Sequence, residues 1–259
     1  MDLGLKRRSA IVCGSSKGLG RACAEALAEA GAQVVINGRN KTGLEQVAQD
    51  IAKKTGACVI PVAADLNTAT GRAALLAACP HPDILVNNNG GPPFREFRDL
   101  NRDALEKGVA MNMLTPIELI QLVIDGMAAR GFGRIVNITS VSVKMPVSGL
   151  DLSSGARAGL TAFLAGVSRE YADKGVTINQ LLPGYFRTER LQQGFEASAE
   201  KTGRDVEDVA RDWSNQVPAQ RFGDPVEFGQ TCAFLCSQYA SYLTGQNILL
   251  DGGLHRSAF

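Results

Sequence analysis

Short apolar runs alternate along this chain with longer stretches in which apolar residues recur every three or four positions. Runs rich in β-branched residues predict strands, and the longer periodic stretches predict amphipathic helices. The predicted strands cover residues 10–13, 33–37, 58–62, 84–87, 134–139, 177–182 and 247–250. The main predicted helices cover residues 19–30, 43–53, 116–130, 156–172 and 226–239.

This alternation predicts an α/β fold: a Rossmann-type, doubly wound parallel sheet of about seven strands, with helices on both faces. We expect one dinucleotide-binding domain over residues 1–259. Ligands of such sheets bind beyond the carboxyl ends of the strands. Residues 187–220 are polar and irregular, between a strand and the last predicted helix, and we expect them to form a lid over a substrate.

The amino-acid composition of the chain limits the kinds of partner that it is expected to bind. The chain has 27 Lys plus Arg against 26 Asp plus Glu, so no bulk positive field favours nucleic acid or anionic lipid. No signal peptide is apparent, and no uninterrupted apolar run approaches the roughly 18 residues that indicate a membrane helix. The 6 cysteines lack a Cys-x-x-Cys spacing, which fits a reducing cytoplasm. Cys232 and Cys236 share a helix face, but with no His nearby we expect packing and no metal site.

A glycine-rich loop follows the first predicted strand directly and leads into a helix. Glycines permit a tight turn and let the backbone approach a pyrophosphate, whose charge the helix N terminus favours. We therefore predict that this loop binds a dinucleotide cofactor. Its predicted cofactor-binding residues are Gly14, Ser16, Lys17, Gly18, Leu19 and Gly20.

The spacing Gly14, Gly18, Gly20 resembles the G-x-x-x-G-x-G motif of the short-chain dehydrogenase/reductase family, and the chain is most like its 3-oxoacyl-acyl-carrier-protein reductase type. Further family motifs match in order as far as residue 253. The resemblance assigns Asp65 to the adenine, Asn89 and Gly90 to a cofactor-binding N-N-A-G turn, Asn112 to the active site, and Pro183, Gly184 and Thr188 to the nicotinamide-side loop of the cofactor site. Asn89 stands where the family has Ala.

The residue after the second strand selects the cofactor, because an acid there binds a ribose hydroxyl whereas a cation accommodates a 2′-phosphate. This chain has Arg39 there, and Lys17 in the glycine loop adds a second cation. A guanidinium suits a phosphate because it is planar and offers several donors. We therefore predict NADP(H) rather than NAD(H), the other interpretation being that both cations are solvated.

The proton-transfer motif departs from the family pattern. The family uses a Tyr as proton donor, a Lys four residues later that lowers the pKa of the Tyr and holds the ribose, and a Ser thirteen residues earlier. Ser140 matches the Ser, but the other two positions hold Ser153 and Arg157, and no Tyr lies between Ser140 and Tyr171. A serine hydroxyl is too weak an acid for the role of the phenol. Arg157 keeps the positive charge and is expected to bond the cofactor ribose, but it stays protonated and cannot relay protons.

Three functions are consistent with this departure, and we rank them in this order. The first is an NADP(H)-dependent oxidoreductase for a carbonyl or alcohol, with Asn112, Ser140, Ser153 and Arg157 as its catalytic group and water, Tyr185 or Lys144 as the acid. The second is a catalytically inactive cofactor-binding sensor or structural subunit, in which Ser153 and Arg157 only cap or solvate a helix. The third is a lyase or dehalogenase. Halohydrin dehalogenases also carry Arg for this Lys, but they keep the Tyr and lose the cofactor loop.

Family members usually assemble through the two helices predicted here at residues 116–130 and 156–172. Gly155, Gly159 and Gly166 lie within or just before the second of these helices. Glycine inside a helix costs about 1 kcal/mol relative to Ala, which favours a packing role. We expect a homotetramer or a homodimer.

The substrate is expected to be a small molecule. Several cations fall in segments that border the predicted pocket, which suits an acidic substrate. A solvated rim explains the same residues equally well. These cations are Lys144, Arg157, Arg187 and Arg190.

Overall fold

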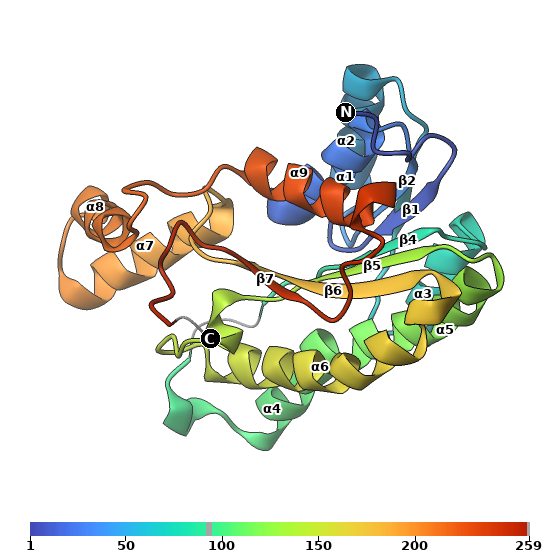
Figure 1. The fold of residues 1–259 in the computed structure, drawn as a ribbon. Coiled ribbons are helices and arrows are strands. Elements are labelled where there is room, and N and C mark those ends of the chain that lie inside the picture. Colours follow the sequence, from blue (N-terminus) through green and yellow to red (C-terminus); the bar gives the residue numbers. More distant parts are fainter. Residues whose placement is uncertain (92–94, 258–259) are drawn as a thin grey trace.

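Seven parallel strands form one sheet in the computed structural model, which describes residues 1–91 and 95–257. Their order is β3-β2-β1-β4-β5-β6-β7, so the direction of winding reverses between β1 and β4. Helices cover both faces of the sheet (Figure 1). The prediction of a doubly wound α/β fold is confirmed. The reversal point is where such sheets bind ligands.

Each predicted strand and helix is observed, most of them with small shifts at their ends, and α3, α4, α7 and α8 are additional to the predicted helices. The strands are β1 Ser9–Val12, β2 Gln33–Gly38, β3 Val59–Ala63, β4 Ile84–Asn87, β5 Gly133–Ile138, β6 Val176–Pro183 and β7 Asn247–Leu250. The helices are α1 Gly18–Glu29, α2 Lys41–Thr55, α3 Ala69–Ala78, α4 Arg102–Val109, α5 Thr115–Ala129, α6 Asp151–Glu170, α7 Glu189–Thr202, α8 Val206–Gln216 and α9 Pro225–Cys236. The start of α6 at Asp151, ahead of residue 156, brings Ser153 and Arg157 into its first two turns.

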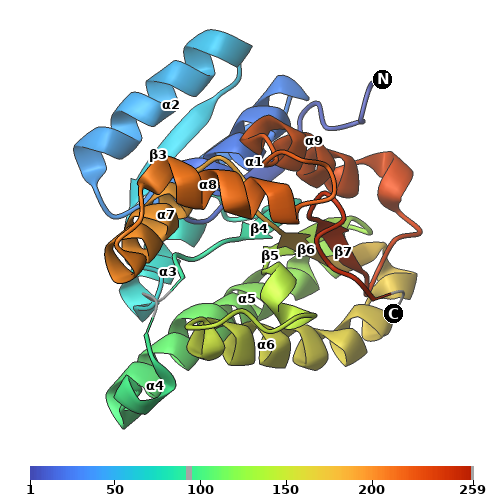
Figure 2. The same ribbon diagram turned by 90° about the vertical axis from the view of Figure 1, so that its left-hand side faces the viewer.

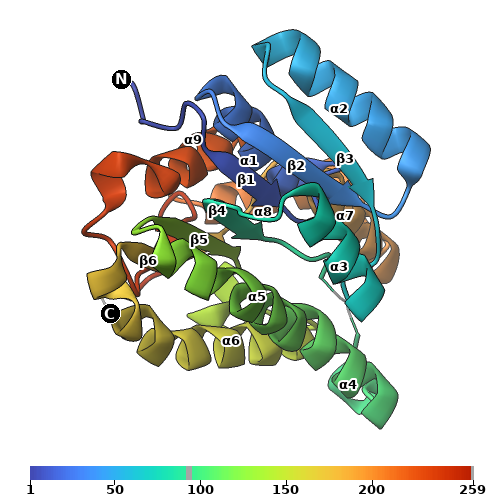
Figure 3. The ribbon, with the colours of Figure 1, turned by 90° about the vertical axis from the view of Figure 1, so that its right-hand side faces the viewer.

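Alternate residues of the strands enter two separate cores. Ala10 and Val12 of β1 face α1, α2 and α9, whereas Ile11 faces α3, α5 and α6. Figure 3 shows these two helix layers above and below the sheet. Strands buried on both faces are apolar throughout, which explains runs such as Ile84-Leu85-Val86. Cys232 and Cys236 are buried in the first core, in agreement with their predicted packing role.

The segment 187–220, expected to be irregular, contains the two helices α7 and α8. Side chains cap both helices: Thr188 Oγ1 accepts from Leu191 N, and Asp205 Oδ1 accepts from Glu207 N. Sparse apolar residues form a cluster of their own, which gives the segment a small separate core. Its members are Phe195, Ala199 and Val209, with Leu191, Val206, Ala210, Trp213 and Phe222 packed against them. Figure 2 shows α7 and α8 in front of the sheet, on the side where its strands end.

By length and composition alone, the stretch Arg102–Ala129 is long and apolar enough to cross a membrane. No such stretch was expected from the sequence. The reason is that α4, a π-helical turn at Ala110–Leu114 and α5 join into one helical run. Half of its apolar window is buried inside the fold, and Ile120 and Ile124 belong to the core beneath the sheet. Core helices of globular proteins pass the same test, so this feature is weak evidence for a membrane span.

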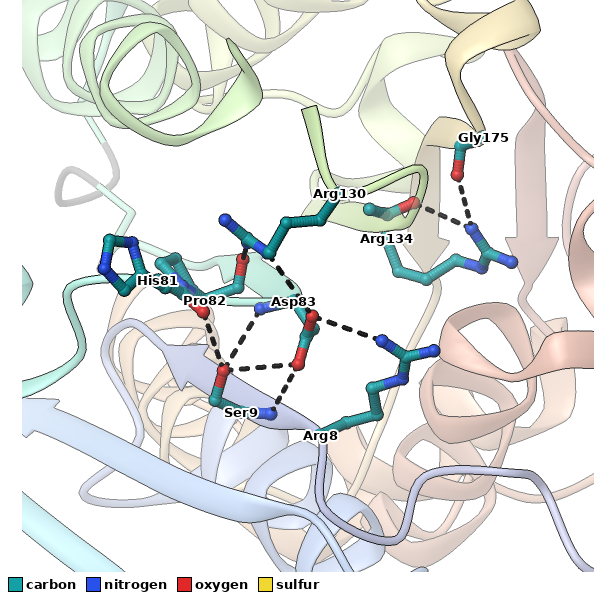
Figure 4. Close-up of polar contacts among 9 residues, drawn as sticks. Arg8, Ser9, His81, Pro82, Asp83, Arg130, Arg134 and Gly175 are labelled. Carbon is teal, nitrogen blue, oxygen red and sulfur yellow. Dashed lines mark hydrogen bonds and ion pairs between the residues drawn. The ribbon is translucent and has the colours of Figure 1, made fainter. Parts of the chain in front are cut away.

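We call the end of the sheet where β1, β4 and β5 begin the amino edge. Here the Asp83 carboxylate accepts hydrogen bonds from Arg8 Nη1 (3.3 Å) and from the backbone N–H of Ser9 (3.0 Å). Arg130 Nε lies 3.9 Å from the same carboxylate. Figure 4 shows these groups gathered around Asp83. One carboxylate thus fixes side chains that lie far apart in the sequence.

Arg134 occupies the same edge and is buried. Its guanidinium donates to the carbonyls of Gly133 (2.8 Å), Gly175 (3.0 Å) and Ser237 (3.2 Å). Its Cζ atom also lies 4.3 Å from the centre of the Phe132 ring, whose face favours a cation. The environment of Arg134 is therefore built entirely from the chain itself.

Candidate active site

The carboxyl edge, where β1, β4, β5 and β6 end, gathers the predicted cofactor residues. Gly14 has a φ of +53°, and a Cβ there would lie 2.6 Å from the Asn88 carbonyl oxygen. A Cβ at Gly20 would lie 2.4 Å from the Gly14 carbonyl oxygen. Only glycine permits this approach of the loop to the end of β4. The resulting turn brings the N terminus of α1 to the carboxyl edge.

The N terminus of α1 fits a pyrophosphate. Lys17, at its N-cap position, makes no side-chain capping bond, whereas Asn40 and Thr68 cap α2 and α3. The first N–H groups of α1 are thus left without a side-chain acceptor, and a helix N terminus of this kind binds phosphate. The donors present match the cofactor that the glycine spacing predicts.

The predicted cation pair lies on the surface beside this loop. Arg39 follows β2 and is exposed. Lys17 is exposed as well and forms an ion pair with Glu189 at the start of α7. Asp65, assigned to the adenine, follows β3 and accepts from Asn67 N (3.0 Å), which orders its turn. Arg39 and the turn at Asp65 thus lie at the ends of the neighbouring strands β2 and β3.

Ser153 and Arg157 face the fold on the first turns of α6. Their exposed fractions are 5% and 8%. Arg157 Nε donates to Ser153 Oγ (3.1 Å), Nη1 to the Ile138 carbonyl (2.6 Å) and Nη2 to the Asn89 carbonyl (3.3 Å). Burial and the nearby charge of Arg190 lower the pKa of Arg157 to about 10, so it stays protonated at neutral pH. The two residues therefore form one buried polar unit.

Asn89 connects this unit to the π-helical turn. Its amide donates to the Met111 carbonyl (2.6 Å), while its own carbonyl accepts from Arg157. Asn112 in that turn is buried, and its amide donates to the Gly108 carbonyl (3.4 Å). Its Oδ1 atom has no hydrogen-bond partner among the described residues. The predicted active-site Asn thus lies at the centre of a π turn, a distortion often found at functional sites.

Ser140 ends the segment that follows β5, and its hydroxyl accepts from Ser142 N (3.1 Å). The two other residues considered as acids are poorly suited. Lys144 is exposed. The Tyr185 ring packs 5.1 Å from Trp213, and burial raises the pKa of Tyr185, which makes it a weaker acid.

The predicted nicotinamide-side loop joins the sheet to α7. Pro183 ends β6, and a Cβ at Gly184 would lie 2.7 Å from Asp251 Cα, so the loop packs closely on the C-terminal segment. The Thr188 side chain lies over Gly18, 3.7 Å from the position of a Cβ there. A cavity of about 670 Å³ runs along this side of α7. Its described lining includes Arg187, Thr188, Leu191, Gln192, Phe195 and Phe222.

Asn37 at this edge was not among the predicted site residues, and Arg190 was predicted only as one of several cations bordering the pocket. Asn37 of β2 donates from its amide to the carbonyls of Val62 (3.0 Å) and Ala64 (3.1 Å), tying β2 to the turn after β3. A polar residue at the end of an apolar strand is the signal that marks it. Arg190 of α7 donates to the Gly91 carbonyl (3.2 Å), a contact that no local pattern indicates.

The family model described as enoyl-(acyl carrier protein) reductase matches residues 14–255. The chain therefore belongs to the short-chain dehydrogenase/reductase family. It is 32% identical to the NADPH-dependent reductase BacG of Bacillus subtilis (strain 168), over 98% of this chain and 100% of that protein.

Two further relatives span the same length. The 3-oxoacyl-(acyl-carrier-protein) reductase FabG of Aquifex aeolicus is 31% identical over 98% of this chain and 100% of its own. The structure of L-sorbose reductase from Gluconobacter frateurii, complexed with NADPH and L-sorbose, superposes with a TM-score of 0.93 at 27% identity, covering 99% of this chain and 100% of that one.

Proposed function

We propose that this chain is an NADP(H)-dependent oxidoreductase acting on a carbonyl or alcohol carbon of a small molecule, with Ser153 and Arg157 where the family keeps a Tyr and a Lys. The observation that carries the proposal is their pairing at the carboxyl edge, where Arg157 donates to Ser153 Oγ and to the loop after β4. The close-packed glycines, the uncapped α1 and two relatives named or solved with NADPH support the choice of cofactor.

Each residue has a definite part in this proposal. The nicotinamide supplies or accepts a hydride when it is bound. Because Ser153 Oγ already accepts from Arg157 Nε, its hydroxyl hydrogen is directed elsewhere and donates to the substrate oxygen. The buried charge of Arg157 favours negative charge that builds up on that oxygen. Serine is too weak an acid to complete the transfer, so the proton comes from water.

Calorimetric titration with NADPH and NADH, followed by an NADPH-oxidation assay on neutral and acidic carbonyl compounds, tests the proposal. We expect NADPH to bind more tightly than NADH and at least one carbonyl class to be reduced. Failure to bind either cofactor contradicts the proposal as a whole. Tight NADPH binding without turnover of any carbonyl contradicts the enzymatic part alone.

A second candidate is a cofactor-binding protein that does not turn over. The observation in its favour is that Arg157 joins Ser153 to the carbonyls of Ile138 and Asn89. In addition, Tyr185 packs against Trp213 and Lys144 is exposed, so neither is well suited as the acid. In that case Arg157 fixes the loop after β4 in a cofactor sensor or a structural subunit. The same assay separates the two candidates.

We also infer a cytoplasmic homotetramer or homodimer. Its six cysteines are free thiols, which suits a reducing compartment. Leu122 on α5 and Phe163 on α6 are exposed. Nothing lies within 4 Å of a Cβ placed at Gly155 or Gly166, so both glycines leave room for a neighbouring helix. Exposed apolar side chains beside such gaps favour helix packing between copies.

A further inference from the structure

Arg157 carries a buried charge that the described chain does not neutralise. Its hydrogen bonds go to a hydroxyl and to two backbone carbonyls. No ion pair involves it among residues 1–91 and 95–257. A guanidinium has more N–H donors than these contacts use. Buried charges in proteins are normally paired, because transfer of an ion from water is costly.

Arg134 shows how the same chain treats a buried guanidinium that has only a structural role. Its carbonyl contacts resemble those of Arg157, but its cation lies against the Phe132 ring. The face of an aromatic ring partly compensates a positive charge. At Arg157 the described neighbours supply no aromatic face and no carboxylate. The group that compensates its positive charge must therefore come from elsewhere.

A second cation, Arg190, lies near Arg157. Arg190 Nη1 donates to the Gly91 carbonyl (3.2 Å), and a Cβ at Gly91 would lie 2.8 Å from Arg190 Nη2. Arg157 holds the carbonyl of Asn89, two residues earlier in the same loop. The positive charge of Arg190 contributes to the lowered pKa of Arg157. Two guanidinium groups therefore converge on one short loop, where they repel each other and attract an anion.

We propose that the substrate carries a carboxylate and that Arg157 and Arg190 bind it together at the loop Asn89–Gly91. The proposal rests on the function proposed above, because it places this carboxylate beside Ser140 and Ser153. Cofactor phosphates are the other source of an anion. They are assigned to the α1 N terminus, Lys17 and Arg39, which belong to the loops after β1 and β2. Arg157 joins the loop after β4 to Ser153, so we assign the anion at this loop to the substrate.

The test compares two ligands that differ in charge: 2-oxo-4-phenylbutanoate and its ethyl ester. Each is titrated calorimetrically into the protein loaded with NADP⁺, so that no hydride transfer occurs. We expect the acid to bind at least tenfold more tightly than the ester. Arg190→Gln should remove most of this preference, a loss of about 10- to 100-fold in affinity for the acid, since bonds to charged groups are worth about 1.5–3 kcal/mol.

Arg204→Gln is the matched control. Arg204 lies between α7 and α8, is exposed and pairs with Asp212, so its loss changes the net charge equally without reaching the site. This variant should keep the preference for the acid. Arg190→Gln should also leave NADPH affinity within about twofold, and a large loss there would assign the anion to the cofactor and overturn the proposal. Equal binding of acid and ester, no binding of the acid, or an unchanged preference in Arg190→Gln overturns it as well.

The failure of this proposal is distinct from failure of the proposed function. If the protein binds neither NADPH nor NADH, the oxidoreductase assignment fails first. The acid and the ester are then compared on the protein without cofactor, and the same preference is expected. Gly91→Ala provides a second variant, because its methyl group displaces the Arg190 guanidinium while keeping the charge. We expect it to weaken binding of the acid about 3- to 10-fold, a smaller loss than the charge removal causes.

Discussion

At the amino edge of the sheet, Arg134 donates to three backbone carbonyls and lies against the Phe132 ring. At the carboxyl edge, Arg157 donates to two backbone carbonyls and to Ser153, and its charged neighbour is another arginine. Both guanidinium groups are buried, so burial does not distinguish them. Their surroundings do: each has another arginine nearby, Arg8 for Arg134 and Arg190 for Arg157, but among the described residues only Arg134 also lies against an aromatic ring.

The amino edge is thus built for stability: Asp83 holds Arg8 and Ser9, and the groups around it satisfy one another. At the carboxyl edge, two cations converge and the buried amide oxygen of Asn112 has no hydrogen-bond partner among the described residues. A buried amide oxygen of this kind is expected where a ligand completes the structure. The contrast predicts that substitutions at the amino edge mainly affect the stability of the fold, whereas substitutions at the carboxyl edge mainly affect ligand binding and turnover.

The largest expected effect is on turnover. Ser153→Tyr combined with Arg157→Lys restores the family's acid and its pKa-lowering neighbour, and NADPH-dependent carbonyl reduction should appear or rise by about 10²- to 10⁴-fold. Each single substitution should give less, because the phenol and the ammonium act as a unit. Ser154→Tyr is the control, since it places a phenol one residue away from that helix face.

Two results would go against this expectation. Brisk carbonyl reduction by the wild type, with a slower double variant, would mean that the Ser/Arg pair is a working alternative. If both proteins bind NADPH and neither reduces any carbonyl, the site is not shaped for hydride transfer and the cofactor-binding candidate replaces the enzyme.

The second prediction compares the two arginines directly. Arg134→Met leaves three carbonyls without their donor and should lower the free energy of unfolding by about 2–4 kcal/mol. Arg157→Met also loses three contacts, but unlike Arg134→Met it gives up no contact with an aromatic ring, so its loss should be smaller by about 1 kcal/mol. Urea unfolding measures both values. NADPH affinity should be unchanged in Arg134→Met, and an equal or larger stability loss in Arg157→Met would erase the distinction between the edges.

The preference for NADPH over NADH tests the part of the carboxyl edge at the end of β2. Arg39→Asp removes the cation expected to meet a 2′-phosphate and places an acid near the ribose hydroxyl. The ratio of NADPH to NADH affinity should fall about 10- to 100-fold. Lys41→Asp, an equal charge change two residues further on at the start of α2, should alter the ratio much less. An unchanged ratio in Arg39→Asp would show that the end of β2 does not select the cofactor.

Self-association of the chain is expected through the outer face of α5 and α6, away from both edges of the sheet. Phe163→Glu places a charge on this exposed apolar face and should weaken self-association by at least about tenfold. Light scattering over a range of micromolar concentrations measures it. Phe97→Glu serves as the control, because Phe97 is equally apolar and 76% exposed but lies outside both helices. A wild-type protein that is monomeric at these concentrations would contradict the expected oligomer.

The smallest expected effect is at the ion pair between Lys17 and Glu189, which joins the glycine loop to α7. Both partners are exposed, and such pairs contribute about 0–1 kcal/mol. Glu189→Gln should free Lys17 for the 2′-phosphate and tighten NADPH binding about two- to threefold. NADH affinity should not change, because NADH lacks that phosphate. Weaker NADPH binding in Glu189→Gln would mean that Glu189 itself supports the cofactor site.

The fold and the cofactor loop were predictable because their signals are local. β-branched runs indicate strands, and the glycine spacing at Gly14 and Gly20 follows from backbone contacts that any side chain would block. The helices α7 and α8 were missed because few of their residues are apolar and these pack on one another rather than on the sheet. The apolar periodicity of helices that pack in such a small separate core extends over too few residues to be recognised in the sequence.

The candidate site shows the complementary limit. Asn89 and Arg157 were each recognised as departures from the family pattern, but nothing in the sequence joins them. In the structure the Asn89 carbonyl accepts from Arg157 across 68 positions of the chain. Arg190 was noted only as one of several cations, because its contact with Gly91 spans 99 positions. Contacts of this range depend on the assembled sheet, which a local pattern does not describe.

Trp213 gives this protein a built-in optical probe. It is the only tryptophan in the chain, and its ring lies 5.1 Å from Tyr185 in the loop after β6 and 5.4 Å from Phe195 of α7. Its indole emission therefore depends on how α7 and α8 sit against that loop. Because the absorption of reduced nicotinamide overlaps tryptophan emission, energy transfer from Trp213 would report the distance between α8 and a bound cofactor without any added label.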